Sequence, residues 1–538
     1  MASSPLEVKS GPVDVLEIAP ARWSGRAAVT FDSSARVCRM ETRVEELHAL
    51  CEWLTAEAGY VFATLVVEES PAESWSLRYL FYAPSGLRAE VLVRTEGPHP
   101  SVPSLSDLPE GPSYDWHERE AEDLFGVNFP GHPRLGDFVL HEDWPEGVNP
   151  MRASFDAARR LETRESNPRW RAPLILSSPG SFAMPIGPIF SDFAESSHFL
   201  LETVGEDVVR TVPRFFYKYR GLEKLAEGRP LDRVLLLAER FSGNAAFAHA
   251  LALCEAAEEI CGVEVPQRAR VLRTVLAELE RLRHHAATIT GICHSTALGV
   301  AASQAALIEE DLLRLTCQVA GHRYLFGALA PGGLCFDPGE AQCERLKASS
   351  GEAAQRLAQL HSQLRYSSSF LDRLEEVGIV SREAALSYGL VGPIARASGV
   401  SRDLRKLCPY LAYETCDFPV AIQHEGDGYA RLRVFFQEAQ TSVAIIRELL
   451  NELPSGPVLA GAALTPRSGS AWRAVETPSG AAFHYLRLHR DGTVARYRVT
   501  PAAFVNWHGF HLAAENFAFQ DFPIILASFG LSNAECDR

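Results

Sequence analysis

The chain has 538 residues, 46% hydrophobic and 22% charged, which is typical of a globular protein with more than one domain. Its 68 acidic residues outnumber 52 basic ones, and the formal net charge of −16 argues against nucleic acid as the main partner. Eleven cysteines without a Cys-x-x-Cys pair predict a reduced, cytosolic chain. No apolar stretch reaches the roughly 20 residues of a membrane helix, so membrane contact is expected only through partners.

The first block, from about residue 25 to 150, has the pattern of an α+β domain. Glu41–Gly59 carries apolar residues at helical spacing, and Ser113–Phe125 has the pattern of an acidic helix. Short β-prone runs lie between these two helices. The expected strands are Val61–Val67, Leu77–Tyr82 and Ala89–Arg94.

The second block, from about residue 181, is mainly helical. Several long amphipathic stretches with short connections favour a helical bundle. These stretches are Asn244–Cys261, Val265–Ala286, Ala341–Val377 and Asp427–Leu453. Ala471–Arg498 returns to strand-like alternation around Asp491-Gly492, a hairpin signal. We therefore expect an α+β fold with an α+β domain at 1–150, a linker at 151–180 and a larger helical domain with small β elements near its ends at 181–538.

A distinctive string closes the first block. Glu118–Pro133 reads EREAEDLFGVNFPGHP. This resembles the signature of the C subunit of bacterial NADH:quinone oxidoreductase (respiratory complex I), which has ERE, an acidic residue, FG, F and GHP. The basic pair that follows in that family is replaced here by Gly136-Asp137.

Three strings in the second block point to a related family. Tyr219–Glu227, Gly262–Leu276 and Gly392–Arg405 resemble the D subunit of complex I and the large subunits of membrane-bound nickel–iron hydrogenases. One chain that carries both blocks most resembles the large subunit of formate-hydrogenlyase-type hydrogenases. The resemblance implies a neighbouring small subunit that carries a [4Fe–4S] cluster.

The nickel–iron ligands of the hydrogenases are missing. Such a centre needs four thiolates, because soft sulfur donors hold these metals. In the hydrogenases the first pair lies in R-x-C-G-x-C-G-F-A-H, where this chain reads RFSGNAAFAH over Arg240–His249, and the second pair precedes the final Asp-Arg. The four former ligand positions hold Ser242, Ala245, Ser532 and Glu535. We therefore expect no nickel–iron centre and no metal on this chain.

The quinone-binding residues of the complex I relatives are also altered. In those relatives a His in an early hairpin loop and a Tyr near the first former cysteine donate hydrogen bonds to the headgroup. These positions fall on Phe190 and Gly243, while a second family His matches His198. Glu535 matches the acidic residue that complex I carries near its C-terminus. A differently bound quinone or another acceptor stays open.

Two polar features have two interpretations each. Glu278, Arg281 and His284 recur along one predicted helix, either as a proton relay or as a structural ion pair beside a capping His. Arg396 would lie near the cavity by resemblance, either tuning the cluster of the partner or satisfying loop carbonyls.

The leading expectation is a peripheral subunit on the cytoplasmic side of a complex I-like, hydrogenase-related, ion-translocating membrane complex. Its partners would be a B-type iron–sulfur small subunit and antiporter-like membrane subunits, and it would bind no cofactor alone. One rival is an oxidoreductase that reduces quinone or another acceptor in a remodelled cavity. The candidate catalytic residues for that rival are His198, Arg396 and Glu535. The other rival is a non-catalytic scaffold whose old cavity has filled with side chains.

Overall fold

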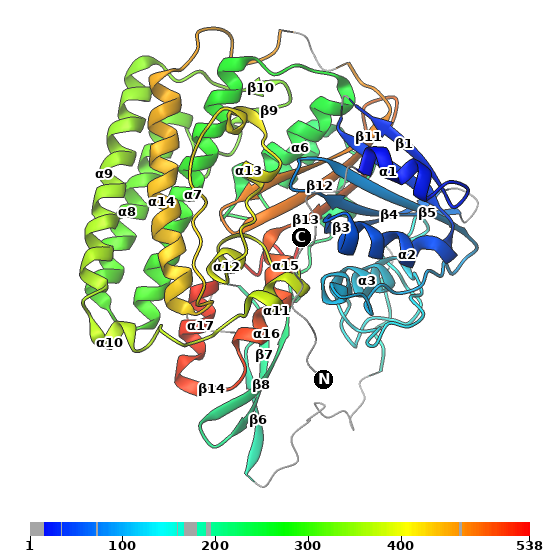
Figure 1. The fold of residues 1–538 in the computed structure, drawn as a ribbon, viewed down its shortest axis with the longest axis horizontal. Helices are drawn as coiled ribbons and strands as arrows, with labels where there is room; N and C mark the ends of the chain where they lie inside the picture. The colour runs from blue at the N-terminus through cyan, green and yellow to red at the C-terminus, as the bar shows by residue number, and fades with distance from the viewer. Residues whose placement is uncertain are drawn as a thin grey trace. The chain divides into compact units, whose positions relative to one another are not determined.

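The structure is a computed structural model that describes residues 15–33, 35–70, 74–158, 160–165, 180–189, 195–461 and 465–538. Long helices combine with several small sheets, which confirms the predicted α+β class (Figure 1). Internal contacts gather the chain into two compact units, Met1–Pro168 and Arg169–Arg538.

The first unit is built on a five-stranded sheet in the order β1-β2-β5-β4-β3. β2 and β5 run parallel, and the other neighbouring strands run antiparallel. The strands are β1 (Ala27–Asp32), β2 (Val37–Thr42), β3 (Val61–Ser70), β4 (Ser74–Tyr82) and β5 (Arg88–Glu96). The three strands expected from the sequence are thus confirmed as β3, β4 and β5, each a few residues longer than predicted.

Helices complete this unit. They are α1 (Val15–Arg22), α2 (Leu47–Glu52) and α3 (Gly111–Phe125). Helix α3 packs against β3, where the ring of Tyr114 stacks on Phe62 with centroids 4.2 Å apart. The helix predicted over Glu41–Gly59 is shorter than expected as an α-helix, because a 3-10 turn precedes α2 and a π turn follows it.

The EREAEDLFG string lies on α3, and its acidic residues hold loops in place. The buried carboxylate of Glu118 accepts hydrogen bonds from Ser104 Oγ at 2.5 Å and from the amide of Leu105 at 2.8 Å. Asp123 Oδ2 accepts three consecutive amides, those of residues 138–140, at 2.7–3.0 Å. These contacts give the signature acids a structural role within this unit.

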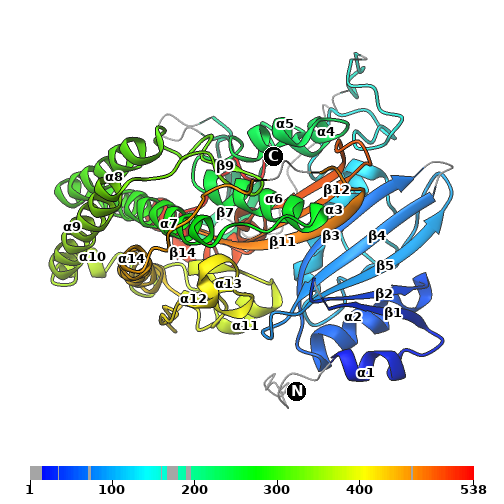
Figure 2. The ribbon, with the colours of Figure 1, turned by 90° about the horizontal axis from the view of Figure 1, so that it is seen from above.

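The second unit contains a bundle of four long helices that lie side by side in both views (Figures 1 and 2). They are α7 (Gln267–Ser295), α8 (Gly299–Ala320), α9 (Glu340–Leu364) and α14 (Gly428–Asn451). α7 packs against both α8 and α14, and α9 packs against the same two helices. The helix predicted over Ala341–Val377 ends at Leu364, because three successive serines follow and favour helix caps over helix interiors. A single turn, α10 (Ser368–Leu371), comes next.

An antiparallel sheet packs against α6 (Ala246–Cys261) in the same unit. Its strands are β11 (Gly469–Thr477), β12 (Gly480–Leu488) and β13 (Val494–Thr500). The predicted hairpin is confirmed between β12 and β13, where Gly492 supplies the positive φ of +84° that the turn requires.

A second small sheet has the order β14-β8-β7-β6. Its strands are β6 (Ser181–Ile186), β7 (His198–Val204), β8 (Asp207–Arg214) and β14 (Phe517–Ala518).

Short helices connect the larger elements. They are α4 (Leu222–Ala226), α5 (Leu231–Ala238), α11 (Arg382–Ser387), α12 (Gly392–Ala397), α13 (Leu404–Leu407), α15 (Ala502–His508), α16 (Phe510–Ala513) and α17 (Phe522–Phe529). Within the described ranges, no helix has an apolar stretch sufficient to cross a lipid bilayer.

Candidate functional site

The loop that joins α5 to α6 carries two of the former ligand positions, and helix α7 holds it. Glu280 on α7 accepts the amide of Phe247 at 2.8 Å and that of Ala248 at 3.0 Å, at the start of α6. These amides have no partner within the helix, so a carboxylate there caps the helix and complements its dipole. Arg283, one turn along α7, donates to the carbonyl oxygen of Gly243 at 3.0 Å. The carboxylate of Glu280 and the guanidinium of Arg283, both on α7, therefore hold the loop in place.

Ser242 and Glu535 meet in this loop. The Ser242 hydroxyl donates to Glu535 Oε1 at 2.7 Å, and both side chains are about 1% exposed. Ala245 is fully buried beside them, and its amide reaches Ser242 Oγ at 3.4 Å. Three of the four former ligand positions thus lie together, and a hydroxyl–carboxylate pair links the two segments that carry them.

The fourth position, Ser532, also pairs with a carboxylate. Its hydroxyl donates to Glu195 Oε1 at 2.7 Å. Glu195 Oε2 accepts the amide of Asn533 and, at 3.2 Å, that of Ala534. Glu195 lies in the connection between β6 and β7, and its carboxylate therefore binds three successive residues of the C-terminal segment.

A series of buried side chains with ionisable groups runs from Glu535 through two histidines to a tyrosine of the β12–β13 hairpin. His249 Nε2 lies 3.8 Å from Glu535 Oε1. His249 Nδ1 is hydrogen-bonded to His484 Nε2 at 3.0 Å, and His484 Nδ1 to the Tyr497 hydroxyl at 2.8 Å. All four side chains are at most 1% exposed. Burial, followed by the nearby His249, lowers the pKa of His484 well below its usual value, so this imidazole is neutral at neutral pH.

Two further carboxylates near the C-terminus differ in charge state. Burial opposes ionisation of Glu223, but Arg498, Arg496 and Arg538 outweigh it and lower the pKa of that carboxyl to about 2. Burial raises the pKa of Asp537 to about 6, despite a backbone hydrogen bond and the positive charge of Arg220. Glu223 is therefore an anion over the whole physiological pH range, whereas Asp537 gains or loses its proton near pH 6.

Metal-ligand chemistry is limited at this site. Cys536 is the thiol in the C-terminal motif, and burial raises its pKa well above the usual value, which disfavours the thiolate that binds metals. Across the part of the chain that the structure describes, no cluster of three or more His, Cys, Asp or Glu is arranged to hold a metal ion. The residues at the former ligand positions are hydroxyl, methyl and carboxylate groups, which do not fit a centre that needs four thiolates.

Three cavities lie elsewhere. One of about 290 Å³ lies between α8 and α9, one of about 410 Å³ lies at the start of α8, and one of about 450 Å³ is lined by residues of the range 145–162. None of these three is lined by Ser242 or Glu535.

Comparison with known proteins covers most of the chain. The family "Respiratory-chain NADH dehydrogenase, 49 Kd subunit" matches residues 305–468 and 460–538, and the corresponding 30 Kd subunit family matches 40–160. The nickel-dependent hydrogenase family matches 220–289, which includes the α5–α6 loop. The NADH-quinone oxidoreductase C/D 2 subunit of Aquifex aeolicus is 31% identical over 78% of this chain and 74% of its own length. The chain belongs to the family of fused C/D subunits.

Relatives of hydrogenase type are similar as well. Formate hydrogenlyase subunit 5 of Escherichia coli is 28% identical over 86% of this chain and 82% of its own length. Hydrogenase-4 component G of the same organism is 28% identical over 80% of this chain and 75% of its own length. This C/D-type chain is thus a complex I- and hydrogenase-related subunit, and the resemblance inferred from its motifs is confirmed.

The former quinone-donor positions of this C/D-type chain have different environments. Gly243 is exposed, and no heavy atom of the described residues lies within 4 Å of the place where its Cβ would be. Phe190 falls outside the described residues. His198 begins β7, opposite Arg214 of β8, and is half-buried. Burial, and then the charge of Arg214, lowers the pKa of His198. Its role stays a prediction.

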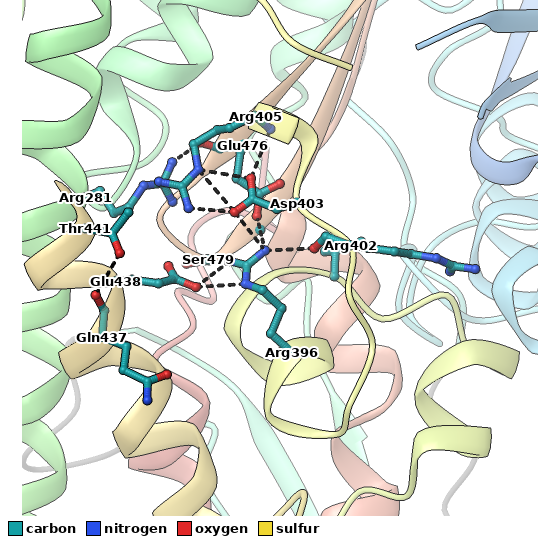
Figure 3. A network of polar contacts seen from close by, with 12 residues as sticks. Arg281, Arg396, Arg402, Asp403, Arg405, Gln437, Glu438, Thr441, Glu476 and Ser479 are labelled. Carbon is teal, nitrogen blue, oxygen red and sulfur yellow. Dashed lines mark hydrogen bonds and ion pairs between the residues drawn. The ribbon is translucent and has the colours of Figure 1, made fainter. Parts of the chain in front are cut away.

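Arg396 lies in a buried ion-pair network (Figure 3). Its Nε donates to Glu438 of α14 at 2.8 Å, and Nη1 donates to Glu476 of β11 at 2.7 Å. Nη1 also reaches the carbonyl oxygen of Arg402 at 2.9 Å. Through its own contacts, the side chain of Arg396 joins α12, α14 and β11, and it satisfies one loop carbonyl, as one of its two interpretations states.

Glu278 and Arg281 extend the same network. Their ion pair measures 3.4 Å, and Arg405 approaches Glu278 to 3.1 Å. His284 lies apart from that pair, with Nε2 3.5 Å from the hydroxyl of Ser479. Its neighbour His285 instead joins the network through a 3.0 Å contact to Glu438. The Glu278–Arg281 pair of the structural interpretation is confirmed, whereas the histidine that contacts the network is His285 and not the predicted His284.

Several residues of the site were not predicted from the sequence. Glu195 pairs with Ser532 across 337 residues of chain, and no local signal marks it. His249 was matched only as part of the hydrogenase motif. His484 and Tyr497 face it from the hairpin, and alternation along β12 and β13 could have placed them on one face of the sheet.

Proposed function

We propose that this chain is the peripheral cytoplasmic subunit of a complex I-like, hydrogenase-related, ion-translocating membrane complex. It forms the wall of the cavity beside a [4Fe–4S] cluster held by a B-type small subunit, and it carries no nickel–iron centre. Antiporter-like membrane subunits anchor it, and neither nucleic acid nor a cofactor of its own takes part. Residues 1–150 act as the C-type domain, 151–180 as the linker and 181–538 as the D-type domain.

One observation carries this proposal. In place of thiolates, a 2.7 Å hydrogen bond ties Ser242 of the α5–α6 loop to Glu535 of the C-terminal segment, and a second 2.7 Å hydrogen bond ties Ser532 to Glu195 of the β6–β7 connection. The Ser242–Glu535 pair keeps the two former ligand segments joined, as a metal does in the hydrogenases, without redox chemistry of its own. The architecture of the catalytic subunit is thereby retained while its metal is given up.

An oxidoreductase that reduces quinone or another acceptor is the second candidate. Oε2 of the buried Glu535 has no hydrogen-bond partner among the described residues, and this favours the candidate over a scaffold with a filled cavity. None of the described atoms lies within 4 Å of a Cβ at the exposed Gly243, which also leaves room for an added side chain. A buried polar atom without a partner is costly, and a catalytic role is one of the reasons for which a native protein retains it. The buried methyl of Ala245 fits the scaffold better.

The proposal is tested by purifying the tagged chain from gently solubilised native membranes and identifying the proteins that accompany it by mass spectrometry. We expect an iron–sulfur small subunit and antiporter-like membrane proteins in near-equal amounts. Recovery of the chain alone from the soluble fraction would refute the proposed membrane complex.

The two candidates are separated in the same preparation. His198→Gln and Glu535→Gln should each abolish electron transfer to an added quinone if the cavity is catalytic, while assembly persists. His489→Gln, at an exposed position of the hairpin, is the matched control. Unchanged electron transfer in both site variants would exclude these residues from catalysis.

A further inference from the structure

The hydrogen-bonded series of side chains Tyr497–His484–His249 has a defined donor-to-acceptor direction. Among the described residues, the Tyr497 hydroxyl has one hydrogen-bond partner, His484 Nδ1 at 2.8 Å. If the hydroxyl accepted a proton from that nitrogen, its own proton would have no acceptor in a fully buried position. The hydroxyl therefore donates. Burial raises the pKa of Tyr497 well above its usual value, so the phenol keeps the proton that it donates.

This direction fixes both histidine tautomers. His484 accepts at Nδ1, so as a neutral imidazole it carries its proton on Nε2 and donates that proton to His249 Nδ1 at 3.0 Å. His249 then carries its own proton on Nε2. In each of the two rings, the hydrogen bond at one nitrogen thus determines whether the other nitrogen carries the proton.

At the outer end of this hydrogen-bonded series, a buried donor lies beside a buried acceptor, and neither has a partner among the described residues. His249 Nε2 lies 3.8 Å from Glu535 Oε1, too far for a hydrogen bond, and that oxygen already accepts from Ser242. Both His249 Nε2 and Glu535 Oε2 are buried and have no hydrogen-bond partner among the residues that the structure describes. The ring of Phe241, 4.4 Å from the imidazole between centroids, closes one side.

We propose that His249 Nε2–H and Glu535 Oε2 form a two-point binding site for one hydroxylic oxygen, and that Tyr497 and His484 are positioning residues which set its polarity. The occupant must accept from the imidazole and donate to the carboxylate. Water and an organic hydroxyl both have this chemistry, whereas a ketone or a metal ion does not.

The test is ring-¹⁵N NMR of the full chain with labelled histidine. The His249 signals are assigned by their loss in His249→Gln. We expect wild-type His249 to be protonated at Nε2 and unprotonated at Nδ1. Tyr497→Phe should mix the two tautomers, while Tyr366→Phe, at an exposed position, leaves the spectrum unchanged. A wild-type His249 protonated at Nδ1 alone overturns the proposal, even if Tyr497→Phe fails to fold.

The occupant is identified in the same sample. A nuclear Overhauser contact from His249 Hε2 to water in plain buffer supports the site, and its loss is expected in Glu535→Leu. Added phenol that replaces the water contact with its own shows that organic hydroxyls enter, whereas an unchanged water contact restricts the site to water. Absence of any contact to water or phenol in the wild type overturns the proposal.

Discussion

Ser242 and Glu535 lie 293 residues apart in sequence, and a 2.7 Å hydrogen bond joins them at a buried point. Ser242→Ala removes a donor to a buried carboxylate, and hydrogen bonds to charged groups contribute about 1.5–3 kcal/mol. We expect the free energy of unfolding, measured by urea denaturation, to fall by about 2 kcal/mol. Ser303→Ala, at an exposed position on α8, should change it by less than about 0.5 kcal/mol. Equal effects would mean that the pair adds no stability.

Gly243 should accept a side chain. Its backbone φ is not positive, and a Cβ there would meet no heavy atom of the described residues within 4 Å. Gly243→Ala and Gly243→Tyr are expected to change the free energy of unfolding by less than about 0.5 kcal/mol. Gly392→Ala is the contrasting variant, since its φ is +68° and the new Cβ would lie 2.3 Å from Ser479 O. That change should cost about 2 kcal/mol or more.

Gly243→Tyr also tests the quinone interpretation. It restores the residue type that the complex I relatives carry at this position. If loss of this donor limits quinone reduction, the variant should increase electron transfer to an added quinone in the purified complex, whereas Gly243→Phe should not. Equal rates for both variants would show that the missing hydroxyl does not limit the reaction.

Arg396→Met should be strongly destabilising. The change leaves Glu438 and Glu476 without their shared guanidinium, and breaking a buried ion pair from one side costs about 3–5 kcal/mol. Arg314→Met is the control, because that side chain is 67% exposed in its pair with Glu310 and should contribute less than about 1 kcal/mol. Urea denaturation of the two variants measures the difference, and a small loss for Arg396→Met would contradict the structural role.

Glu255 should make the protein less stable as the pH rises. Burial raises the pKa of this carboxyl from 4.5 to about 7, against the charges of Arg473 and Arg273. Because the folded pKa lies above the unfolded one, its contribution is fully present below about pH 4.5 and is lost as the pH rises through 7. The loss amounts to about 3 kcal/mol.

The test of that linkage compares the free energy of unfolding at pH 4.5 and pH 8. Glu255→Gln, which has no charge to bury, should show a smaller fall between these values than the wild type. Glu344→Gln, at a largely exposed position, should follow the wild type. Parallel curves for Glu255→Gln and the wild type would exclude Glu255 as the cause.

Local patterns predicted most of the fold. The helical spacing of apolar residues placed α6 and α14 to within a few residues, since such stripes must face the core. It also placed the start of α7, which continues to Ser295, nine residues beyond the predicted end at Ala286. Helix α8 was not predicted, although it carries the same signal. Its buried apolar residues at helical spacing are Ala305, Ile308, Leu312, Leu315 and Val319.

The site was predictable only where a motif carried it. The two motifs identified Ser242, Ala245, Ser532 and Glu535, because a motif fixes positions even when the ligands have changed. The partner carboxylate Glu195 and the two residues behind His249 come from distant segments. Their proximity is a product of tertiary packing, which no periodicity in one segment encodes.

Helix α7 is held on two sides at nearly the same level. Arg281 donates to the carbonyl oxygens of Glu476 and Thr477 of β11, while Glu280 and Arg283 hold the α5–α6 loop. At 3.6 residues per turn, residues two apart point about 200° from one another. Turning the helix about its axis would break both sets of contacts at once, whereas a slide along the axis would carry both sets in the same direction. Any motion that α7 transmits between the network and the loop is therefore a translation along the helix axis and not a rotation about it.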